Sequence, residues 1–311
     1  ASEDYKPFDV DVTTEDPGVE ALRNTGAGDT QWGIRVVIGP DVTNTGAGGI
    51  AYIDSFNWDT DTPTYVFNNS FKGMAEAISH EVGHTIGLFH DGDSTQGYYP
   101  GHGTGATSWA PIMGVGYYTE VVQWSKGEYP DANNTEDDLV IITTQNGFGY
   151  RTDDHGGSIS AASGLMVTGG TAVADRGLIE RTSDVDFFSF YTGAGTISFD
   201  IDPYYKTPNL DILANLYDAG GNLIASSNPT DQLDASLSLK VAPGQYHLSI
   251  EGVGRAATTG DAGYSDYGSI GQYTIRGTVF PFGGMEYDVS DNYVVWAAQN
   301  GTDTDIYFYD G

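Results

Sequence analysis

The stretch HEVGHTIGLFHD, residues 80–91, decides how the first half of this 311-residue chain is interpreted. His80 and His84 stand four positions apart, so on a helix their imidazoles share one face, one turn apart. Gly87 lets the chain turn, because glycine enters the left-handed conformation at little cost, and His90 can then come back to the same place. Three imidazoles are a ligand set of catalytic zinc, which keeps its fourth position for water. The pattern therefore predicts a zinc site.

Glu81 directly follows the first of these histidines, which places its carboxylate beside the metal rather than on it. Such a carboxylate can take a proton from the attacking water and later deliver it to a leaving amine, so Glu81 is the expected general base. The alternative is that these are ordinary surface histidines, or that they hold a purely structural zinc. A structural zinc would not need a base beside it, which favours catalysis.

The chain around this stretch predicts a sheet followed by a helix. Strand-like runs at residues 8–13, 33–38, 49–53 and 64–67 are separated by turns rich in Gly and Asp. The helix is expected to begin at Asn69 or Ser70, either of which can cap it. Its expected buried face consists of Phe71, Ala75, Ile78, Val82, Ile86 and Phe89. A second helix is expected at residues 135–144 with Thr135 as its cap.

Residues 80–91 resemble the zinc-binding signature of the metzincin peptidases, HExxHxxGxxH followed later by a methionine turn. The sequence WAPIMG, residues 109–114, fits that turn, and the resemblance implies that Met113 forms an apolar floor under the imidazoles. An Asp straight after the third histidine, here Asp91, resembles the pattern of the reprolysin or adamalysin-like group. The resemblance implies that Asp91 supports the zinc ligands without binding the zinc itself. The resemblance also implies an edge strand that aligns an extended substrate, made of Gly49, Ile50, Ala51 and Tyr52.

The sequence departs from the metzincin pattern at two places. Astacins and serralysins carry a tyrosine two residues after the methionine, as an extra ligand and oxyanion donor, but that position here is Val115. Tyr117 or Tyr118 could do a similar job, or could line the pocket as packing aromatics, and His102 could donate to the oxyanion or be solvated. A metzincin also opens with a strand and a long helix, and residues 1–8 begin after them. Those elements precede this chain in a longer precursor, or the variant lacks them.

The second half of the chain favours a β-sandwich, because strand-like runs recur between Gly and Asn turns over residues 177–279. The segments DVDFFSF (184–190), LDILANLYDAGG (210–221) and APGQYHLSI (242–250) resemble the bacterial pre-peptidase C-terminal (PPC) domain, a small sandwich attached to secreted peptidases. The resemblance implies either a structural module or one that binds an insoluble matrix ligand, as related collagen-binding sandwiches do. The candidate ligands of a calcium ion, which prefers carboxylate oxygens, are Asp184, Asp186 and Asp211.

The expected fold is an α+β metzincin-like catalytic domain, with a twisted mixed sheet and an active-site helix, followed by an all-β sandwich domain. The expected boundaries are residues 1–156 for the peptidase domain, 157–176 for a linker rich in Gly, Ser and Ala, 177–280 for the PPC-like sandwich and 281–311 for the start of an unassigned β module.

Composition limits the partners of the chain. Twelve Lys and Arg against 43 Asp and Glu give a formal net charge of −31, which repels nucleic acid and anionic membranes. There is no cysteine, so a metal must be held by histidines and carboxylates. No stretch approaches the roughly 18 apolar residues of a membrane span. We expect a monomer from which any export signal has been removed, and the resemblance to the PPC domain implies that it is secreted by a bacterium.

The expected function is that of a secreted zinc metalloendopeptidase, which hydrolyses peptide bonds of extracellular proteins with Glu81 as general base, one catalytic zinc and a second, calcium ion in the sandwich. One alternative is an extracellular binding or adhesion protein with a vestigial protease fold, whose sandwich binds collagen-like protein or polysaccharide. Another is a zinc hydrolase of non-peptide amides, although an edge strand beside the cleft favours peptides.

Overall fold

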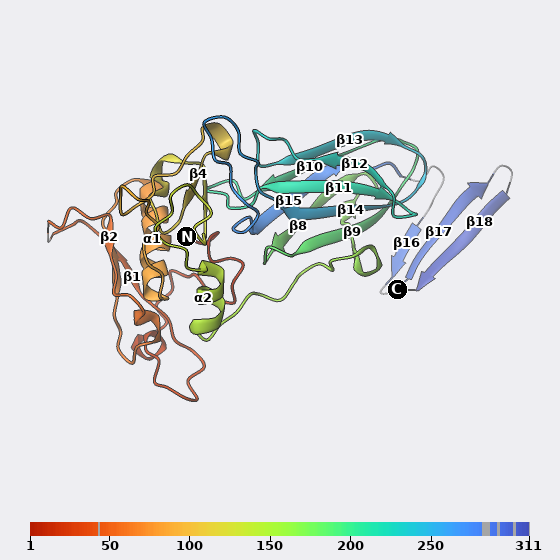
Figure 1. Ribbon diagram of the computed structural model, residues 1–311. Helices are drawn as coiled ribbons and strands as arrows, with labels where there is room; N and C mark the ends of the chain where they lie inside the picture. Colours follow the sequence, from red (N-terminus) through yellow and green to blue (C-terminus); the bar gives the residue numbers. More distant parts are fainter. Residues whose placement is uncertain (43, 282–286, 291–292, 301–302, 311) are drawn as a thin grey trace.

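The computed structural model describes residues 1–42, 44–281, 287–290, 293–300 and 303–310 (Figure 1). These residues contain two α-helices, α1 (Phe71–Thr85) and α2 (Asp138–Gln145). The short 3-10 segments are η1 (Val19–Leu22), η2 (Ser55–Asn57), η3 (Gly105–Thr107), η4 (Gly116–Tyr118) and η5 (Ile159–Ala161). In the part of the chain that is described, no helix is long and apolar enough to cross a membrane.

A small three-stranded sheet precedes α1. Its order is β1 (Val36–Ile38), β3 (Thr64–Val66) and β2 (Gly49–Ile50), with β1 parallel and β2 antiparallel to β3. A short parallel pair follows α1 and consists of β4 (Trp109–Pro111) and β5 (Val121–Gln123). In Figure 1 these elements lie at the red-to-yellow end of the colour bar, around α1.

These elements correct the expected fold class. The α+β metzincin-like domain, with a twisted mixed sheet laid against a helix, is not what the structure contains, because the chain is mostly β and the strands before α1 are only two or three residues long. The strand expected at residues 8–13 forms a single bridge, between Phe8 and Tyr150. The strands are short because side chains in the turns take up backbone N–H groups that would otherwise pair between strands. The carboxylate of Asp29, for example, accepts from two backbone N–H groups of its own turn.

The helix α1 begins where the sequence predicts, but only part of the predicted face is buried: Ile86 is 1% exposed and Val82 packs against the core. Ser70 caps the helix, with its hydroxyl oxygen accepting from the Gly73 N–H. Phe71 and Phe89, expected in the core, are 62% and 55% exposed. The residues of α1 that are buried are mainly small or polar: Gly73, Glu76, Ala77, Ser79, His80, Glu81, Gly83, His84 and Thr85. The second helix, α2, starts later than expected, with Asp137 rather than Thr135 as its cap.

Two five-stranded sheets form the second part of the chain, in the orders β13-β10-β15-β8-β7 and β12-β11-β14-β9-β6. Their strands are β6 (Ser163–Gly164), β7 (Val167–Thr168), β8 (Ala172–Ile179), β9 (Val185–Thr192), β10 (Gly195–Pro203), β11 (Ile212–Asp218), β12 (Leu223–Ser227), β13 (Ala235–Val241), β14 (Gly244–Gly252) and β15 (Gly271–Thr278). Phe190 of one sheet and Phe199 of the other have ring centroids 5.2 Å apart. The two sheets therefore pack face to face around an apolar core.

Residues 157–176, expected to be a linker, supply strands to the sandwich instead. They contain β6, β7 and the start of β8. Leu165 and Val173 are 7% and 4% exposed, so this Gly- and Ser-rich segment carries enough apolar side chains to be held in the core.

The segment expected to open an unassigned module, residues 281–311, forms a three-stranded antiparallel sheet where it is described. The strands are β16 (Tyr287–Ser290), β17 (Tyr293–Asn300) and β18 (Asp303–Asp310). Residues 282–286, 291–292, 301–302 and 311 lie outside the described residues.

One continuous core joins the two parts of the chain. Tyr5, Met113 and Trp124 belong to the same buried cluster as the sandwich residues. The side chain of Gln123 donates to the Asn209 carbonyl, and the Asn209 side chain donates back to the Val122 carbonyl at 2.8 Å. Tyr267 lies at α2, where its hydroxyl oxygen accepts from the Leu139 N–H at 2.8 Å. The sandwich therefore completes the fold of the first part.

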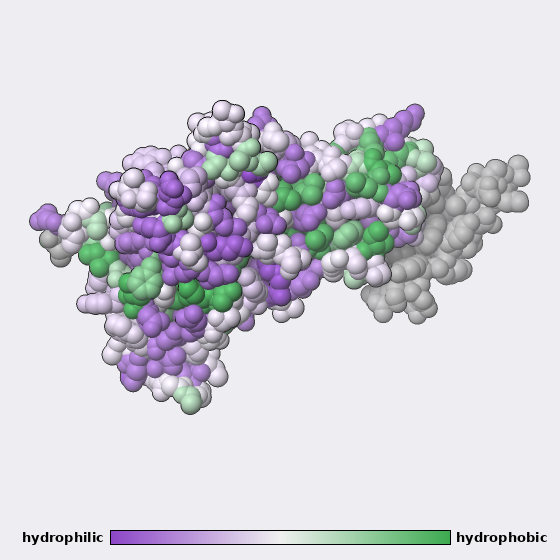
Figure 2. Space-filling model, viewed as in Figure 1, coloured by the Kyte–Doolittle hydropathy of each residue, from purple (hydrophilic) through white to green (hydrophobic). Residues whose placement is uncertain are grey.

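The small sheet is covered on one face only. Val37, Ile50 and Tyr65 are register neighbours on its other face, and all three are exposed. The space-filling view shows hydrophobic patches over both parts of the chain, with hydrophilic residues between them (Figure 2). On the side of the molecule seen in Figure 2, the hydrophobic residues thus form several separate patches rather than a single one.

Candidate functional site

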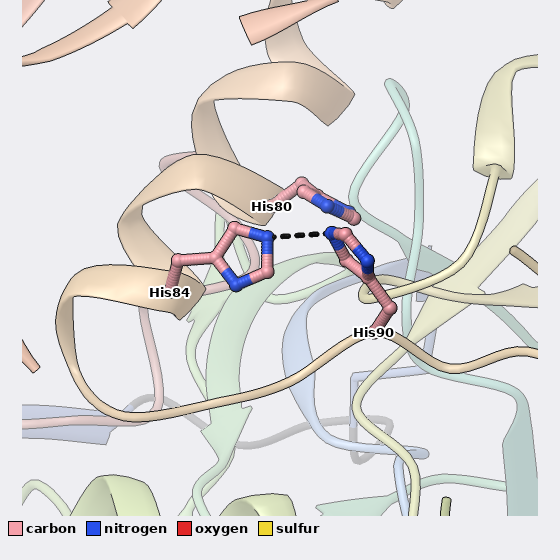
Figure 3. Close-up of side chains that lie close together, drawn as sticks. All are labelled: His80, His84 and His90. Carbon is pink, nitrogen blue, oxygen red and sulfur yellow. Dashed lines mark hydrogen bonds between the residues drawn. The ribbon is translucent and has the colours of Figure 1, made fainter. Parts of the chain in front are cut away.

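The first candidate site is built on α1, which carries His80 and His84 one turn apart. Their ring centroids lie 4.8 Å apart, and both side chains point to the same side of the helix (Figure 3). The helix ends in a Schellman motif: the Gly87 N–H donates to the His84 carbonyl and the Leu88 N–H to the Gly83 carbonyl, both at 3.0 Å. Gly87 has φ +103°, a conformation that favours glycine, and this turn returns His90 to the two helical histidines.

Backbone carbonyls orient two of the three imidazoles. Nδ1 of His80 lies 2.9 Å from the Ile112 carbonyl oxygen, and Nδ1 of His84 lies 2.8 Å from the Leu88 carbonyl oxygen. Because a carbonyl oxygen only accepts, each Nδ1 carries the hydrogen, and the Nε2 atom of a neutral ring then presents its lone pair. Metal-ligating histidines usually have this second hydrogen bond.

The three imidazoles converge on one point. The Nε2 atoms of His84 and His90 are 2.9 Å apart, and one nitrogen from each of the three rings lies within 4.8 Å of the others. A tetrahedral zinc with bonds of about 2.0–2.1 Å holds its nitrogen ligands about 3.3 Å apart. Burial, followed by the charge of His84, lowers the pKa of His80 to about 3 and that of His90 to about 4. The rings are therefore neutral at pH 7, and these residues fit a zinc ion in number, donor type and protonation.

Glu81 lies beside this centre in a space that Gly49 leaves free. A Cβ atom at Gly49 would stand 2.5 Å from Glu81 Cγ and 2.6 Å from its Oε1. The side chain is 6% exposed, and burial raises the pKa of Glu81 to about 7. The position expected for a general base is thus occupied by a carboxylate that is packed in place.

Met113 and Asp91, the expected floor and support of the centre, both lie close to the histidine segment. Met113 is fully buried, and its sulfur would lie 2.5 Å from a Cβ atom at Gly83, in the helical turn between the two histidines. The Asp91 N–H donates to the Met113 carbonyl at 2.9 Å. Its carboxyl group contacts none of the three imidazoles, and burial followed by the charge of Glu136 raises the pKa of Asp91 to about 7. Asp91 thus acts through its backbone.

The expected oxyanion donors differ in position. His102 is engaged on both ring nitrogens, with the Tyr99 hydroxyl at 2.9 Å and the Gly263 carbonyl at 2.6 Å, so it joins the first part to the sandwich. Tyr118 is 83% exposed. The Tyr117 hydroxyl accepts from the Asn68 side chain at 3.0 Å. Of the three, Tyr117 is the one near Glu81. Burial and, to a smaller extent, the charge of Glu81 raise the pKa of Tyr117.

Tyr98 belongs to the site, although the sequence analysis did not identify it. Its ring centroid lies 4.2 Å from that of His90 and 6.0 Å from that of His80. Burial, followed by the charges of Glu81 and Tyr117, raises the pKa of Tyr98. No spacing rule connects this loop tyrosine with the histidines, because its position depends on the path of residues 91–100.

The expected substrate strand is shorter than predicted. Only Gly49 and Ile50 are in β2, whereas Ala51 and Tyr52 lie beyond its end. The strand order places β2 at the edge of its sheet, with Ile50 42% exposed. The edge strand and Glu81, the expected general base, therefore meet at Gly49.

A second candidate site is a group of carboxylates where the chain enters the sandwich. Asp153, Glu180 and Asp184 have carboxylate oxygens within 4.8 Å of one another, and so do Asp153, Asp154 and Asp186. Glu180 is 1% exposed, and neither of its carboxylate oxygens has a hydrogen-bond partner in the described part of the chain. Burial and the neighbouring carboxylates raise the pKa of Glu180 to about 9. A buried carboxylate left unpaired in this way is costly unless a cation joins it.

The third expected calcium ligand, Asp211, lies apart from this group. Its carboxylate accepts from the Tyr264 hydroxyl at 2.7 Å, and it shares no cluster with Asp184 or Asp186. The structure thus places two of the three predicted calcium ligands, Asp184 and Asp186, in this cluster of carboxylates. It adds Asp153, Asp154 and Glu180, which the sequence did not identify as ligands.

No protein-family model matches the chain, and no curated protein matches it. Among solved structures, it is similar to the pre-peptidase C-terminal domain of a collagenase from Bacillus anthracis, with 14% identity over 40% of this chain and 95% of that chain and a TM-score of 0.26. It is also similar to PliG, a periplasmic inhibitor of g-type lysozyme from Aeromonas hydrophila, with 12% identity over 38% of this chain and 96% of that chain and a TM-score of 0.26. Likenesses at this level say nothing about what this chain binds or catalyses. The resemblance of residues 80–113 to metzincins rests on those residues alone.

Proposed function

We propose that this chain is a zinc-dependent endopeptidase that acts on proteins outside the cell. The proposal is carried by the three imidazole nitrogens that converge within 4.8 Å beside the buried carboxylate of Glu81. When held by His80, His84 and His90, zinc would supply Lewis acidity, which polarises a carbonyl group and makes water a stronger acid. The backbone carbonyls of Ile112 and Leu88 keep two of these imidazoles aimed at the ion.

Glu81 performs the proton transfers in this proposal. Its carboxylate takes a proton from the water that attacks the scissile carbonyl and gives a proton to the leaving nitrogen. The exposed edge of β2 favours a peptide over a non-peptide amide, because an extended chain that adds to this edge would pass Gly49, and Glu81 lies against that residue.

The test compares wild-type protein with Glu81→Gln and His84→Ala on casein and on a quenched-peptide library, with zinc counted in each sample. We expect the wild type to cleave, Glu81→Gln to keep one zinc but lose about 10²–10⁴-fold in rate, and His84→Ala to lose the metal. Chelation should abolish cleavage, and added zinc should restore it. A wild type that binds one zinc and cuts nothing would refute the proposal and favour a binding protein.

We also propose that the cluster of carboxylates formed by Asp153, Asp154, Glu180, Asp184 and Asp186 binds a calcium ion. The unpaired oxygens of buried Glu180 carry this proposal, since Ca²⁺ takes six to eight oxygen ligands and favours carboxylates. Because Asp153 and Asp154 precede the first strand of the sandwich, the ion would tie the connecting segment to β8 and β9.

Calcium binding can be tested without any enzyme assay. We expect 1 mM Ca²⁺ to raise the melting temperature by about 5 °C over a chelated sample, as for any ligand that binds only the folded state. Glu180→Gln should remove this response, whereas Asp200→Asn, an exposed carboxylate on β10, should leave it unchanged. Equal responses in both variants would exclude a specific site.

A further inference from the structure

The loop between His90 and the Met113 turn is anchored next to Tyr98, at Tyr99. The Tyr99 N–H donates to the Asp91 carbonyl at 2.7 Å, and the Val115 N–H donates to the Tyr99 carbonyl at 2.9 Å. The Tyr99 ring stacks on Tyr129, with centroids 4.4 Å apart, and is 8% exposed. Because Tyr99 is anchored in the interior, its neighbour Tyr98 is held at the surface of the site.

Tyr98 covers the histidine cluster from that loop. Its ring contacts His90 at 4.2 Å between centroids and reaches His80 at 6.0 Å. The side chain is 44% exposed, so substrate and solvent can reach it. Within the described residues its hydroxyl group has no hydrogen-bond partner, whereas the hydroxyl oxygen of Tyr117 accepts from the Asn68 side chain at 3.0 Å.

A hydrogen-bond donor beside the carbonyl oxygen assists peptide hydrolysis. When water adds to a carbonyl carbon, the oxygen gains negative charge, and a hydrogen-bond donor aimed at that oxygen lowers the barrier. The other cationic or ring N–H groups nearby are engaged: Lys72 donates to the Thr119 carbonyl, and His102 is bonded through both nitrogens. A phenol hydroxyl can supply the missing hydrogen.

We propose that Tyr98 is a catalytic residue that donates a hydrogen bond to the carbonyl oxygen as it becomes negative, an inference that rests on the proposed peptidase function. The water oxygen forms a bond to the carbonyl carbon, its proton goes to Glu81, and the π pair moves onto the carbonyl oxygen. The Tyr98 O–H bonds to that oxygen and keeps its proton. When the carbon–nitrogen bond breaks, the nitrogen takes the pair and a proton from Glu81, and the carbonyl re-forms.

Tyr98→Phe tests this role, because it keeps the ring against His90 and removes only the hydroxyl. We expect kcat to fall about 10²–10³-fold on a quenched peptide, with KM changed less than about threefold and one zinc retained. Tyr118→Phe, which alters an exposed tyrosine nearby, is the matched control and should cleave at the wild-type rate. A loss of zinc in Tyr98→Phe, or a kcat within threefold of wild type, would overturn the assignment.

A second readout does not depend on turnover. A phosphinic peptide has a tetrahedral anionic centre, so calorimetry on the zinc-loaded proteins should find it bound at least tenfold more weakly by Tyr98→Phe than by wild type and Tyr118→Phe. If the wild type cleaves nothing, the peptidase proposal fails, and this binding difference still decides whether Tyr98 recognises a tetrahedral anion. Equal binding by all three proteins would refute the role of Tyr98 whatever the peptide assay gives.

Discussion

Gly49 and Glu81 occupy neighbouring space that leaves no room for a methyl group. A Cβ atom at Gly49 would stand 2.5 Å from Glu81 Cγ and 2.7 Å from the Tyr65 carbonyl oxygen. The backbone side of this contact cannot move without distorting β3, so the Glu81 side chain is the part that would shift. A glycine in an edge strand thus sets the position of the proposed base.

We therefore predict that Gly49→Ala lowers cleavage at least about 10²-fold and stability by about 1–3 kcal/mol, while zinc remains bound. Gly39→Ala is the control, because a Cβ atom there meets nothing within 4 Å. Peptide cleavage, zinc content and melting temperature are measured on both variants. An active Gly49→Ala protein would mean that Glu81 does not need this position.

A pH dependence of stability follows from Glu76, a buried residue of α1. Burial, followed by the charge of Asp4, raises the pKa of Glu76 from 4.5 to about 8. Between pH 4.5 and about pH 8, Glu76 therefore stays protonated in the folded protein but has lost its proton in the unfolded chain. The contribution of Glu76 to stability is complete below pH 4.5 and is lost as the pH rises to about 8.

We expect the melting temperature of the wild type to fall by on the order of 5 °C between pH 5 and pH 8, and Glu76→Gln to make the fall smaller. Thermal melts at fixed salt and calcium give the measurement. A slope that is the same in both proteins would show that Glu76 titrates normally.

Much of the proposed zinc centre could be predicted from the sequence, because a helix fixes the relation between residues four apart and Gly87 marks where the helix stops. Tyr98 and Glu180 could not, since the first depends on the path of a loop and the second on strands distant in sequence. The hydrogen bond between His102 and the Gly263 carbonyl could not be predicted either, because the two residues are separated by 161 positions.

At the scale of elements, α1 explains why only part of the predicted face is buried: Ile86 is 1% exposed, whereas Phe71 is 62% exposed. An apolar repeat normally marks the side of a helix that faces the core. The buried side of α1 mostly carries small residues and the polar groups of the site, while Phe71 in its first turn and Phe89 beyond its end remain exposed. The strands of the second part were easier to predict: runs such as residues 196–201 and 246–250 coincide with β10 and β14, where apolar and polar residues alternate or the strand is central.

The C-terminal end of α1 gives a further prediction. Gly87 has φ +103°, and a side chain in the left-handed region costs about 1–2 kcal/mol. Gly87→Ala should keep α1 helical but displace His90, which weakens zinc binding about 10–100-fold. Competition with a chromogenic chelator measures the affinity, and circular dichroism checks the helix. Gly97→Ala, in open space, is the control and should bind zinc as the wild type does.

At the scale of the whole molecule, the first part is predicted to depend on the sandwich. Residues 1–156 alone would leave the Val122 carbonyl without its partner Asn209 and the Leu139 N–H without the Tyr267 hydroxyl. We expect this fragment to be insoluble or to lack stoichiometric zinc, whereas residues 1–280 should bind one zinc and melt cooperatively. Zinc counting and calorimetry decide it. A folded, zinc-loaded fragment of residues 1–156 would contradict the shared core.

Asn209→Ala tests the same dependence within the full chain. The Asn209 side chain is 1% exposed and donates to the Val122 carbonyl, whose neighbour Gln123 accepts from the Ile112 N–H at 2.8 Å. The Ile112 carbonyl in turn orients His80. We expect a loss of about 1–3 kcal/mol in the free energy of unfolding, measured by denaturant titration, because the change leaves a buried acceptor unsatisfied. Asn222→Ala, at an exposed turn, should have little effect.

The single core that spans both parts also bears on how such a chain can change over time. A module that is joined only by a tether can be exchanged by recombination, because its neighbour keeps all of its own contacts. Here a crossover near residue 156 would separate Gln123 from Asn209 and Leu139 from Tyr267. Hybrids of this protein with a foreign sandwich should therefore fold only when the contacting residues of the first part and of the sandwich come from the same parent. The two parts are thus expected to evolve as one unit.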